Sequence, residues 1–190
     1  MNSIQRCSWP KSDLIIDYHD REWGVPVHDD RALFEALVLG GAQAGLNWEI
    51  VLKKRTCYRA AFHQFDPSRV ARFGRAAIER MLENSGLIRN RLKLESAVSN
   101  AKAFLMIQEE FGSFDAYVWR FVGGQPKVNR WESLMEIPAR TPESDALSKD
   151  LQQRGFRFVG STITYAVMQA VGMVNDHVVN CYRWPEVQNL

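Results

Sequence analysis

The chain has little cysteine, with three residues in 190: Cys7, Cys57 and Cys181. So few cysteines, in an odd number, cannot form a disulfide framework, which argues against a small disulfide-stabilised secreted domain. The chain also has no apolar run long enough to cross a bilayer, and residues 1–6 lack the pattern of a signal peptide. We therefore expect a cytoplasmic protein.

A large excess of charge of one sign is absent as well, because 24 Lys and Arg residues stand against 22 Asp and Glu residues, for a net charge of +2. The overall charge therefore gives no sign of a nucleic-acid partner. Two local clusters of basic residues are nevertheless present and nearly free of acidic residues: Lys53-Lys54-Arg55 with Arg59, and Arg89, Arg91 and Lys93. A cluster of this kind can bind phosphates but is more often a solvated helix face, and the sequence leaves both interpretations open.

Strand-like alternation is rare, whereas apolar residues recur at helical spacing through most of the chain. The length and a hydrophobic content of 46% are enough for one domain with a substantial core. We expect a single all-α domain over residues 1–190 with roughly eight to ten short helices. The predicted helices cover 29 or 30 to 40–41, about 44 or 46 to 62, a short one from 67, then 76–84, 92–111, 114–121, 142–154 and one after 161; residues 1–28 and 123–140 are predicted to be irregular.

Local signals support several of these boundaries. Asp66-Pro67 supplies a cap followed by proline at the first helical position, and Ser113 and Ser161 are hydroxyl caps. In the helix that ends near residue 62, the buried side is predicted to include Ile50. Cys57, in the same helix, is expected to be a packed thiol.

The segment 37–48 joins two predicted helices and contains three glycines followed by Trp48. Glycine between helices permits a tight turn or the close approach of a ligand. The flat indole of Trp48 could stack on a planar partner. The same pattern fits an ordinary helix–helix corner with a core tryptophan, and this segment alone does not separate the two.

Four possible metal ligands lie near the two ends of the chain. His177 and Cys181 are four residues apart, so in a helical turn they share one face, and eleven residues separate Cys7 from His19. Together they form a Cys2His2 set with the softness and number that tetrahedral zinc requires. Since the protein would fill all four positions, such a site would be structural. The alternative is two unrelated Cys/His pairs.

The helical pattern breaks over residues 86–93, between two predicted helices, which suggests a hairpin motif over about 79–111. A tight turn exposes backbone N–H groups, and with Arg89, Arg91 and Lys93 these could hold DNA phosphates without reading the sequence. Because Gly86 is the one glycine of the turn, the glycine-rich form of this motif is missing. An ordinary helical corner is the alternative.

Four aromatic residues, Trp9, Tyr18, Trp23 and Trp48, lie mostly in segments with Gly and Pro, where a helical core would not place them. Aromatic side chains that converge on a pocket can hold a flipped base. The alternative is that they cover the core.

Taken together, these residues resemble the 3-methyladenine DNA glycosylase I family over almost the whole chain, from Cys7 to Cys181. Many matching stretches occur in order, which makes the resemblance far more specific than any single motif. They are Tyr18-His19-Asp20, Glu22-Trp23-Gly24-Val25-Pro26, Gln43-Ala44-Gly45-Leu46-Asn47-Trp48, Phe62-His63-Gln64-Phe65-Asp66-Pro67, Ser144-Asp145-Ala146-Leu147-Ser148-Lys149, Arg154-Gly155-Phe156-Arg157-Phe158-Val159-Gly160 and Val174-Asn175-Asp176-His177.

The resemblance implies an all-α, helix-hairpin-helix DNA glycosylase-like fold. It implies a structural zinc that joins the N- and C-terminal segments, about 1–28 and 165–190. The implied zinc ligands are Cys7, His19, His177 and Cys181.

The resemblance also implies a monofunctional DNA glycosylase. Such an enzyme flips an alkylated base such as 3-methyladenine out of double-stranded DNA, hydrolyses its N-glycosidic bond and leaves an abasic site. The implied base pocket includes Trp9, Tyr18 and Trp48. We expect a monomer, and we assign DNA contacts to Arg89, Arg91, Lys93, Leu46 and Lys53.

One position departs from the family. Where the family has an acidic residue, typically Glu, that contacts the bound base, this chain has Gly40. We expect the pocket to lose one charge and to gain the volume of a side chain. The chain is then a glycosylase with weakened or shifted specificity, for instance for a bulkier base, or a non-catalytic protein that recognises lesions. A zinc-stabilised interaction module without DNA is least favoured, because it leaves the aromatic set unexplained.

Overall fold

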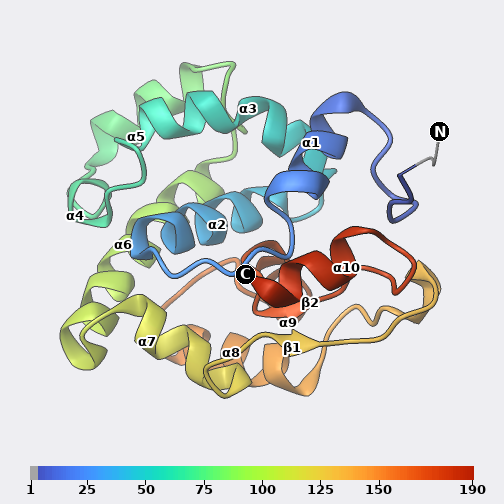
Figure 1. The fold of residues 1–190 in the computed structure, drawn as a ribbon. Coiled ribbons are helices and arrows are strands. Elements are labelled where there is room, and N and C mark those ends of the chain that lie inside the picture. Colours follow the sequence, from blue (N-terminus) through green and yellow to red (C-terminus); the bar gives the residue numbers. More distant parts are fainter. Residues whose placement is uncertain (1–3) are drawn as a thin grey trace.

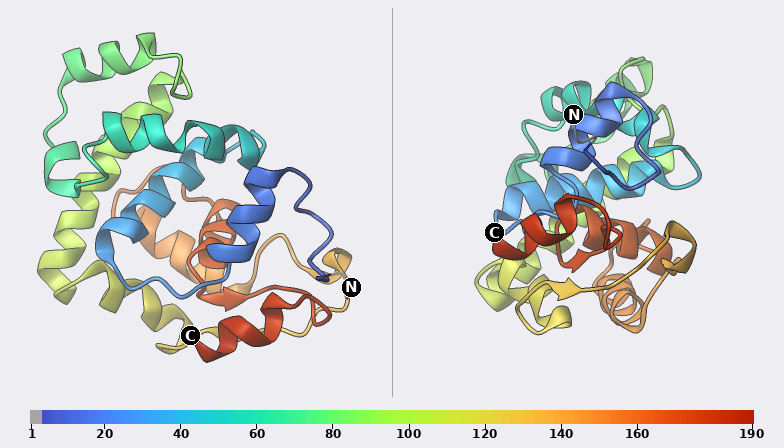
Figure 2. Two further views of the ribbon diagram at one scale, coloured as in Figure 1. Left: turned by 45° about the horizontal axis from the view of Figure 1, so that its top comes forward. Right: turned by 45° about the vertical axis from the view of Figure 1, so that its right-hand side comes forward.

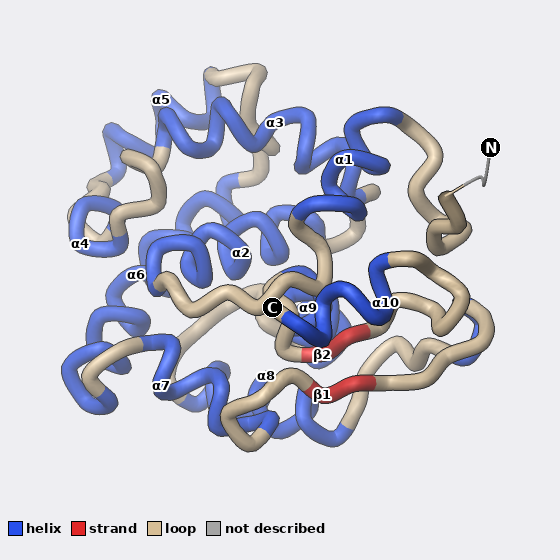
Figure 3. Tube along the Cα trace, in the orientation of Figure 1, coloured by secondary structure: helices blue, strands red, loops and turns tan. Residues whose placement is uncertain are grey.

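The computed structural model describes residues 4–190, so Met1 to Ser3 of the predicted N-terminal segment lie outside the described part of the chain. Helices make up most of that part, which confirms a mainly helical fold (Figure 1; Figure 3). The α-helices are α1 (Asp13–Arg21), α2 (Asp30–Gln43), α3 (Trp48–Ala61), α4 (Pro67–Val70), α5 (Arg75–Glu83), α6 (Arg91–Phe111), α7 (Phe114–Trp119), α8 (Pro142–Gln153), α9 (Ser161–Ala170) and α10 (Arg183–Glu186).

Side-chain caps fix several helix starts where the sequence indicated them. Asp29 and Ser113 each accept a hydrogen bond from the backbone N–H three residues later, at 2.8 and 2.9 Å, at the starts of α2 and α7. Asp66, followed by Pro67, caps α4. The prediction for Ser161 was wrong, because it is the first residue of α9 and the N-cap before it is a glycine without a capping side chain.

Helix α2 lies in the middle of the molecule and packs against α3, α6, α7 and α9 (Figure 1; Figure 2). Its buried side carries Leu33, Phe34, Leu37 and Val38, as the helical spacing predicted. These residues belong to the main apolar core, to which α3 to α9 also contribute.

The prediction that the first long helix ends at Gly40-Gly41 was wrong, since α2 continues through both glycines to Gln43. The reason is packing. A Cβ atom on Gly40 would lie 2.6 Å from Val167 Cγ2 of α9, and one on Gly41 would lie 3.3 Å from Phe158 Cβ. Glycine is unfavourable inside a helix by about 1 kcal/mol relative to alanine. Here it lets two other segments approach the helix.

Two segments predicted to be irregular contain regular structure. Helix α1 covers Asp13–Arg21 within the first 28 residues, and Ser12 caps it. In the loop after α7, β1 (Lys127–Val128) pairs in parallel with β2 (Val174–Asn175). Two-residue strands carry no readable alternation, and this pairing places the loop 129–140 beside the C-terminal segment.

Two side chains of α3 differ from expectation. Ile50 is 43% exposed rather than buried. Cys57 is also exposed. Its Sγ nevertheless lies close to the turn after α5, where a Cβ on Gly86 would be only 2.5 Å from that sulfur. Gly86 is therefore needed for the contact between α3 and this turn.

A second, smaller apolar cluster joins the two ends of the chain. It includes Cys7, Tyr18 and Trp23 from the N-terminal part and Val178 and Cys181 from the C-terminal part. Among the described residues, no helix is both long and apolar enough to span a membrane.

Candidate functional site

A cavity of about 660 Å³ lies between α1, α2, α3, α9 and residues 134–139. On α2 its lining residues recur at helical spacing, at positions 32, 35, 36, 39, 40 and 43, so the cavity follows one face of that helix. Its walls therefore come from segments that are far apart in the sequence.

The four aromatic residues singled out in the sequence, Trp9, Tyr18, Trp23 and Trp48, all line this cavity. The rings of Tyr18 and Trp48 lie 5.4 Å apart at an angle of 52°, and those of Trp9 and Trp23 lie 5.1 Å apart at 74°. The structure thus brings all four to one place, as a pocket for a planar ligand requires.

Two of these side chains have properties suited to such a ligand. The pKa of Tyr18 is raised, first by burial and then by the charge of Glu22, so its hydroxyl stays protonated and can donate a hydrogen bond. The Trp48 indole N–H is buried without a hydrogen-bond partner. A buried indole N–H usually has a hydrogen-bond partner. The position of the Trp48 ring is therefore not explained by a hydrogen bond of its own N–H group.

The two carboxylates that line the cavity are both paired with arginines. Arg55 donates to both oxygens of Glu22, at 2.5 and 2.8 Å, and Arg59 Nε donates to Glu35 at 3.0 and 3.1 Å. Arg55 and Arg59 belong to the basic cluster predicted on α3, and both line the cavity. Sequence reasoning missed this role because their partners lie on other segments.

Gly40 lines the cavity, but the expected gain of volume at this position was wrong. Val167, on the facing helix α9, places a methyl group 2.6 Å from the position that a Cβ on Gly40 would occupy. The room beside Gly40 is therefore filled by an apolar group.

Asp176 supports another wall of the cavity and was not singled out as a site residue by the sequence. This carboxylate is buried and accepts hydrogen bonds from Asn129 and Trp131 on one oxygen, both at 2.7 Å. Its other oxygen accepts from Tyr165 at 2.6 Å and Gln169 at 2.8 Å, and both of these residues line the cavity. Asp176 therefore connects α9 to the loop that follows β1.

Next to the cavity, Cys7, His19, His177 and Cys181 form a buried cluster in which the four ligand atoms lie within 4.8 Å of one another. The sulfur of Cys181 is 3.6 Å from both His19 Nε2 and His177 Nδ1, and the sulfur of Cys7 is 3.7 Å from His177 Nδ1. Standard zinc–sulfur and zinc–nitrogen bond lengths in a tetrahedron give S···N separations of about 3.6 Å. The donor set and its spacing therefore fit a four-coordinate metal ion.

The remaining ring nitrogens of the two histidines are held as metal-binding histidines require. His19 Nδ1 lies 2.8 Å from Asp20 Oδ1, and Arg6 in turn binds the same carboxylate. His177 Nε2 lies 3.1 Å from the carbonyl oxygen of Trp23. Acceptors at these positions orient each ring and leave the other nitrogen for a metal.

The two thiols differ in their tendency to ionise. The pKa of Cys181 lies well below its usual value, first because of its hydrogen bond with the Cys7 thiol and then because of its contacts with His177 and His19. The pKa of Cys7 is raised by its hydrogen bond to the sulfur of Cys181 and by burial. Two thiolates this close repel one another, and a bound cation is what allows both to ionise.

Replacing Asp20 by alanine should weaken metal binding about 10- to 100-fold, because His19 loses the group that orients its ring. Competition with a chromophoric chelator measures this. Asp17→Ala is the matched control, since Asp17 is an exposed carboxylate on the same helix paired with Arg21. Equal affinity in the two variants would show that Asp20 does not support the metal centre.

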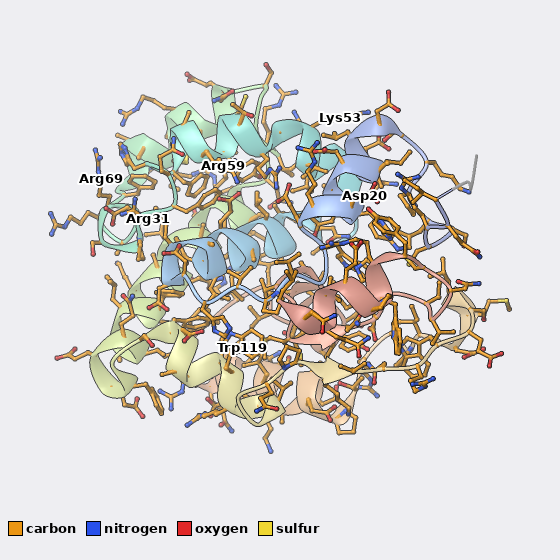
Figure 4. The ribbon with its side chains drawn as sticks, viewed as in Figure 1. Asp20, Arg31, Lys53, Arg59, Arg69 and Trp119 are labelled. Carbon is orange, nitrogen blue, oxygen red and sulfur yellow. The ribbon has the colours of Figure 1, made fainter. Side chains whose placement is uncertain are left out.

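The residues predicted to contact DNA lie near two turns, before α3 and before α6. Leu46 is 38% exposed in the turn between α2 and α3, and Arg89 is exposed in the turn between α5 and α6. Arg91 pairs with Glu79 at 2.7 Å. Lys53 lies outward on α3 (Figure 4) and pairs with Glu49, one turn away, at 2.9 Å.

Lys93 is placed differently from the other basic residues. Its ammonium donates to the carbonyl oxygens of Ala42 and Ala44 at 2.8 and 2.6 Å, at the end of α2. Burial also lowers its pKa. Lys93 therefore stabilises a helix terminus and holds the two turns together.

The predicted hairpin is a turn over residues 84–90 between α5 and α6. Asn84 accepts a hydrogen bond from Gly86 N–H at 2.8 Å, and Ile88 N–H donates to the hydroxyl of Tyr58 at 3.3 Å. Some of the N–H groups expected to be free for phosphates are thus already bonded within the chain. The turn fits phosphate contacts through its side chains better than through its backbone alone.

Comparison with known proteins adds a family. The methyladenine glycosylase family matches residues 9–184. The chain is 51% identical over 183 residues to DNA-3-methyladenine glycosylase 1 of Escherichia coli (strain K12), covering 96% of this chain and 98% of that protein. It is similar to a crystal structure of 3-methyladenine DNA glycosylase I, at 53% identity and a TM-score of 0.92, over 94% of this chain and 98% of the other. A structure of 3-methyladenine DNA glycosylase I from Staphylococcus aureus, described for its recognition of 3-methyladenine, is similar at 34% identity and a TM-score of 0.92, over 96% and 97%.

Proposed function

Because the chain belongs to the methyladenine glycosylase family, we propose that it hydrolyses the N-glycosidic bond of an alkylated base in DNA. Its function is base-excision repair of alkylated bases. One observation carries the proposed chemistry: aromatic side chains from three separate segments converge on a single cavity. A flipped purine needs such a cavity, with flat apolar walls and few polar groups.

In the proposed mechanism the damaged nucleotide leaves the DNA stack and its base enters the cavity. Trp48 stacks on the base, and the protonated Tyr18 hydroxyl is available as a hydrogen-bond donor. A base such as N3-methyladenine carries a positive charge within the nucleotide, so it leaves without protonation by the enzyme. Positioning the nucleotide and a water molecule then supplies much of the rate enhancement.

The proposal includes a hydrolase without lyase activity, which leaves an abasic site. A lyase needs an amine nucleophile at the reacting carbon. Among the described residues that line the cavity, several are arginines and none is a lysine. The lining therefore offers no amine for a covalent intermediate.

We place double-stranded DNA across the turns before α3 and α6, with Leu46, Lys53, Arg89 and Arg91 facing it. Lys93 contributes indirectly, because its ammonium binds the carbonyl groups of Ala42 and Ala44 and so fixes the spacing of the two turns. The hairpin motif over about 79–111 is part of this proposed surface. Contacts of this kind bind the DNA backbone without reading its sequence.

Replacing Arg89 by alanine should weaken binding to any duplex to a similar extent, because one phosphate contact is lost. The slope of log affinity against log salt concentration should fall by about one. Fluorescence anisotropy at several salt concentrations measures both effects. Lys149→Ala is the control, since Lys149 is an exposed cation on α8, on the opposite side of the molecule from the turn at 84–90 (Figure 1; Figure 2). An unchanged slope for Arg89→Ala would remove this turn from the DNA surface.

We further propose that the Cys2His2 cluster binds a structural zinc ion, which its donor set and spacing support. All four positions are protein ligands, so the ion takes no part in catalysis and joins the two terminal segments of one domain. We propose that the protein works in the cytoplasm as a monomer.

A second candidate function rests on Gly40. If a carboxylate at this position is required for excision, the chain binds lesions without removing the base. Chromatography of the free bases released from alkylated DNA separates the two candidates. Release of 3-methyladenine by the wild-type protein supports the glycosylase. Lesion-specific binding without release of any base supports the second candidate and contradicts the first.

A further inference from the structure

A second hollow, of about 620 Å³, lies between α6 and the start of α5, and it shares no lining residue with the cavity. It is at the end of the molecule that carries α4 and α5, away from α10 (Figure 1; Figure 2). On α6 its lining residues are at positions 91, 95, 98, 99 and 102, which share one face of the helix. At 1.5 Å per helical residue, this α5–α6 groove is about 16 Å long.

The floor of the α5–α6 groove is apolar. Ile78 of α5 and Val98 of α6 line it with only 4% and 9% of their surfaces exposed, and the half-buried Phe73 lines it as well. Water over such a floor contacts hydrocarbon, and an apolar group that displaces this water gains free energy. A ligand that fits the groove therefore carries an apolar group.

The rim of the α5–α6 groove is basic. Arg75, Arg91 and Lys102 line it, against one acidic residue, Glu95. Arg75 and Arg91 share an ion pair with Glu79, and Arg91 also lies 3.8 Å from Glu95, whereas Lys102 is exposed without an ion pair among the described residues. Exposed ion pairs contribute little, so these guanidinium groups are available to an anionic ligand.

The segment that builds the groove carries charge mainly of one sign. Residues 67–102 contain eight Lys and Arg residues and three Glu residues, a net charge of +5, whereas the rest of the chain has a net charge of −3. The N-cap of α5, Gly74, also lines the groove and offers no side-chain acceptor to the first N–H groups of the helix. Both features favour a negatively charged ligand.

From these observations we propose that the α5–α6 groove binds a short acidic segment of a partner protein, with an aliphatic side chain on the floor and carboxylates at the cations of the rim. An extended chain advances about 3.3 Å per residue, so about five residues span the groove. A single small anion does not reach both ends. This interaction goes beyond the proposed function, since it involves no residue of the base cavity.

DNA matches the groove less well than an acidic peptide does. Arg91 belongs both to the rim and to the proposed DNA surface, but the sugar–phosphate backbone supplies anions without an aliphatic side chain for the floor. An unpaired base would need a free aromatic face. The ring of Phe73 instead packs against Phe62 and His63, at centroid distances of 6.0 and 5.5 Å.

The test is fluorescence anisotropy with a labelled synthetic peptide of sequence DLDLD. The wild-type protein should bind it at low salt with a dissociation constant of about 100 μM or tighter. A peptide with serine in place of both leucines should bind at least about fivefold more weakly, because the floor stays uncovered.

Lys102→Glu should weaken binding of the leucine peptide at least about fivefold, since an attraction at the rim becomes a repulsion. Lys149→Glu is the matched control. Lys149 is also an exposed lysine on a helix, outside the groove, and its replacement changes the net charge equally. This variant should bind the peptide within about twofold of wild type.

Ser99→Trp tests the shape of the groove. Ser99 lines it, and its hydroxyl donates to the carbonyl oxygen of Ser96 within α6 at 3.0 Å. A tryptophan at this position fills the groove and leaves the residues of the floor in place. Peptide binding should fall at least about tenfold.

Lack of saturable binding by the wild-type protein overturns the proposal, as does equal binding of the serine peptide or an equal loss in the two lysine variants. If the peptide does not bind and Lys102→Glu instead weakens binding of duplex DNA, the groove belongs to the DNA surface. If Ser99→Trp does not fold, the lysine variants and the serine peptide decide. The proposed function is tested by base release, so each can fail without the other.

Discussion

Replacing Trp48 by alanine should reduce the rate of base release by about 100-fold while the protein stays folded. Stacking of one base on one aromatic ring is worth roughly 1–3 kcal/mol, and the upper end of that range is a factor of about 100. The ring centroids of Trp48 and Tyr18 are also 5.4 Å apart, so removal of the indole loosens the packing of the Tyr18 ring. Single-turnover release of 3-methyladenine from duplex DNA measures the effect.

Trp48→Phe is the matched control for this experiment, because it keeps a flat aromatic ring, although a smaller one, and removes the indole N–H. Since that N–H has no partner within the chain, the phenylalanine variant should retain activity within about fivefold of wild type. If Trp48→Ala releases base at the wild-type rate, the base does not stack on this side chain and the assigned pocket is wrong.

Replacing Cys181 by alanine should remove the metal and strongly destabilise the protein. Structural zinc contributes directly to folding, because the unfolded chain has no preformed site. If the ion contributes about 4 kcal/mol, the melting temperature of a chain this long should fall by roughly 8–16 °C. Thermal unfolding together with zinc analysis by atomic absorption measures both consequences.

Cys57→Ala is the matched control, since Cys57 is the cysteine of the described chain that lies outside the metal cluster. It should keep one zinc ion per chain and melt close to the wild-type temperature. Treatment of the wild-type protein with a strong chelator should reproduce the loss seen for Cys181→Ala. A protein purified without zinc that melts at the same temperature after zinc is added would contradict the structural role.

The helices could be predicted where their signals are local. Asp66-Pro67, Ser113 and the spacing of apolar residues in α6 each act within a few residues, and the structure agrees with them. Helix α1 was missed because Pro10 and Gly24 close to it suggested a loop. Strands of two residues could not have been predicted, since β1 and β2 are defined by each other.

The glycine segment shows where sequence reasoning ends. Gly40-Gly41 has the composition of a turn, and only the positions of Val167 and Phe158 show that these glycines serve helix packing. The ion pairs of Arg55 and Arg59 in the cavity depend in the same way on residues of other helices.

The candidate site was more accessible to prediction than its surroundings. The chemistry of Cys and His limits the choice of metal ligands, so four residues at opposite ends of the chain could be grouped before their positions were known. The convergence of Trp9, Tyr18 and Trp48 followed from their unusual context and from the family resemblance. Their support by Asp176 did not, because a hydrogen-bond network has no sequence pattern.

The most direct test of the central claim, that the aromatic cavity binds the alkylated base, is a titration of the protein with 3-methyladenine followed by NMR of the tryptophan indole N–H groups. The ring current of a stacked base should shift the Trp48 resonance. The resonance of Trp184 should not shift, because this residue lies outside the cavity. Its indole N–H donates a hydrogen bond to the carbonyl oxygen of Asn129 at 2.9 Å. A saturating titration that leaves the indoles of Trp9, Trp23 and Trp48 unchanged while one outside the cavity shifts would contradict the account.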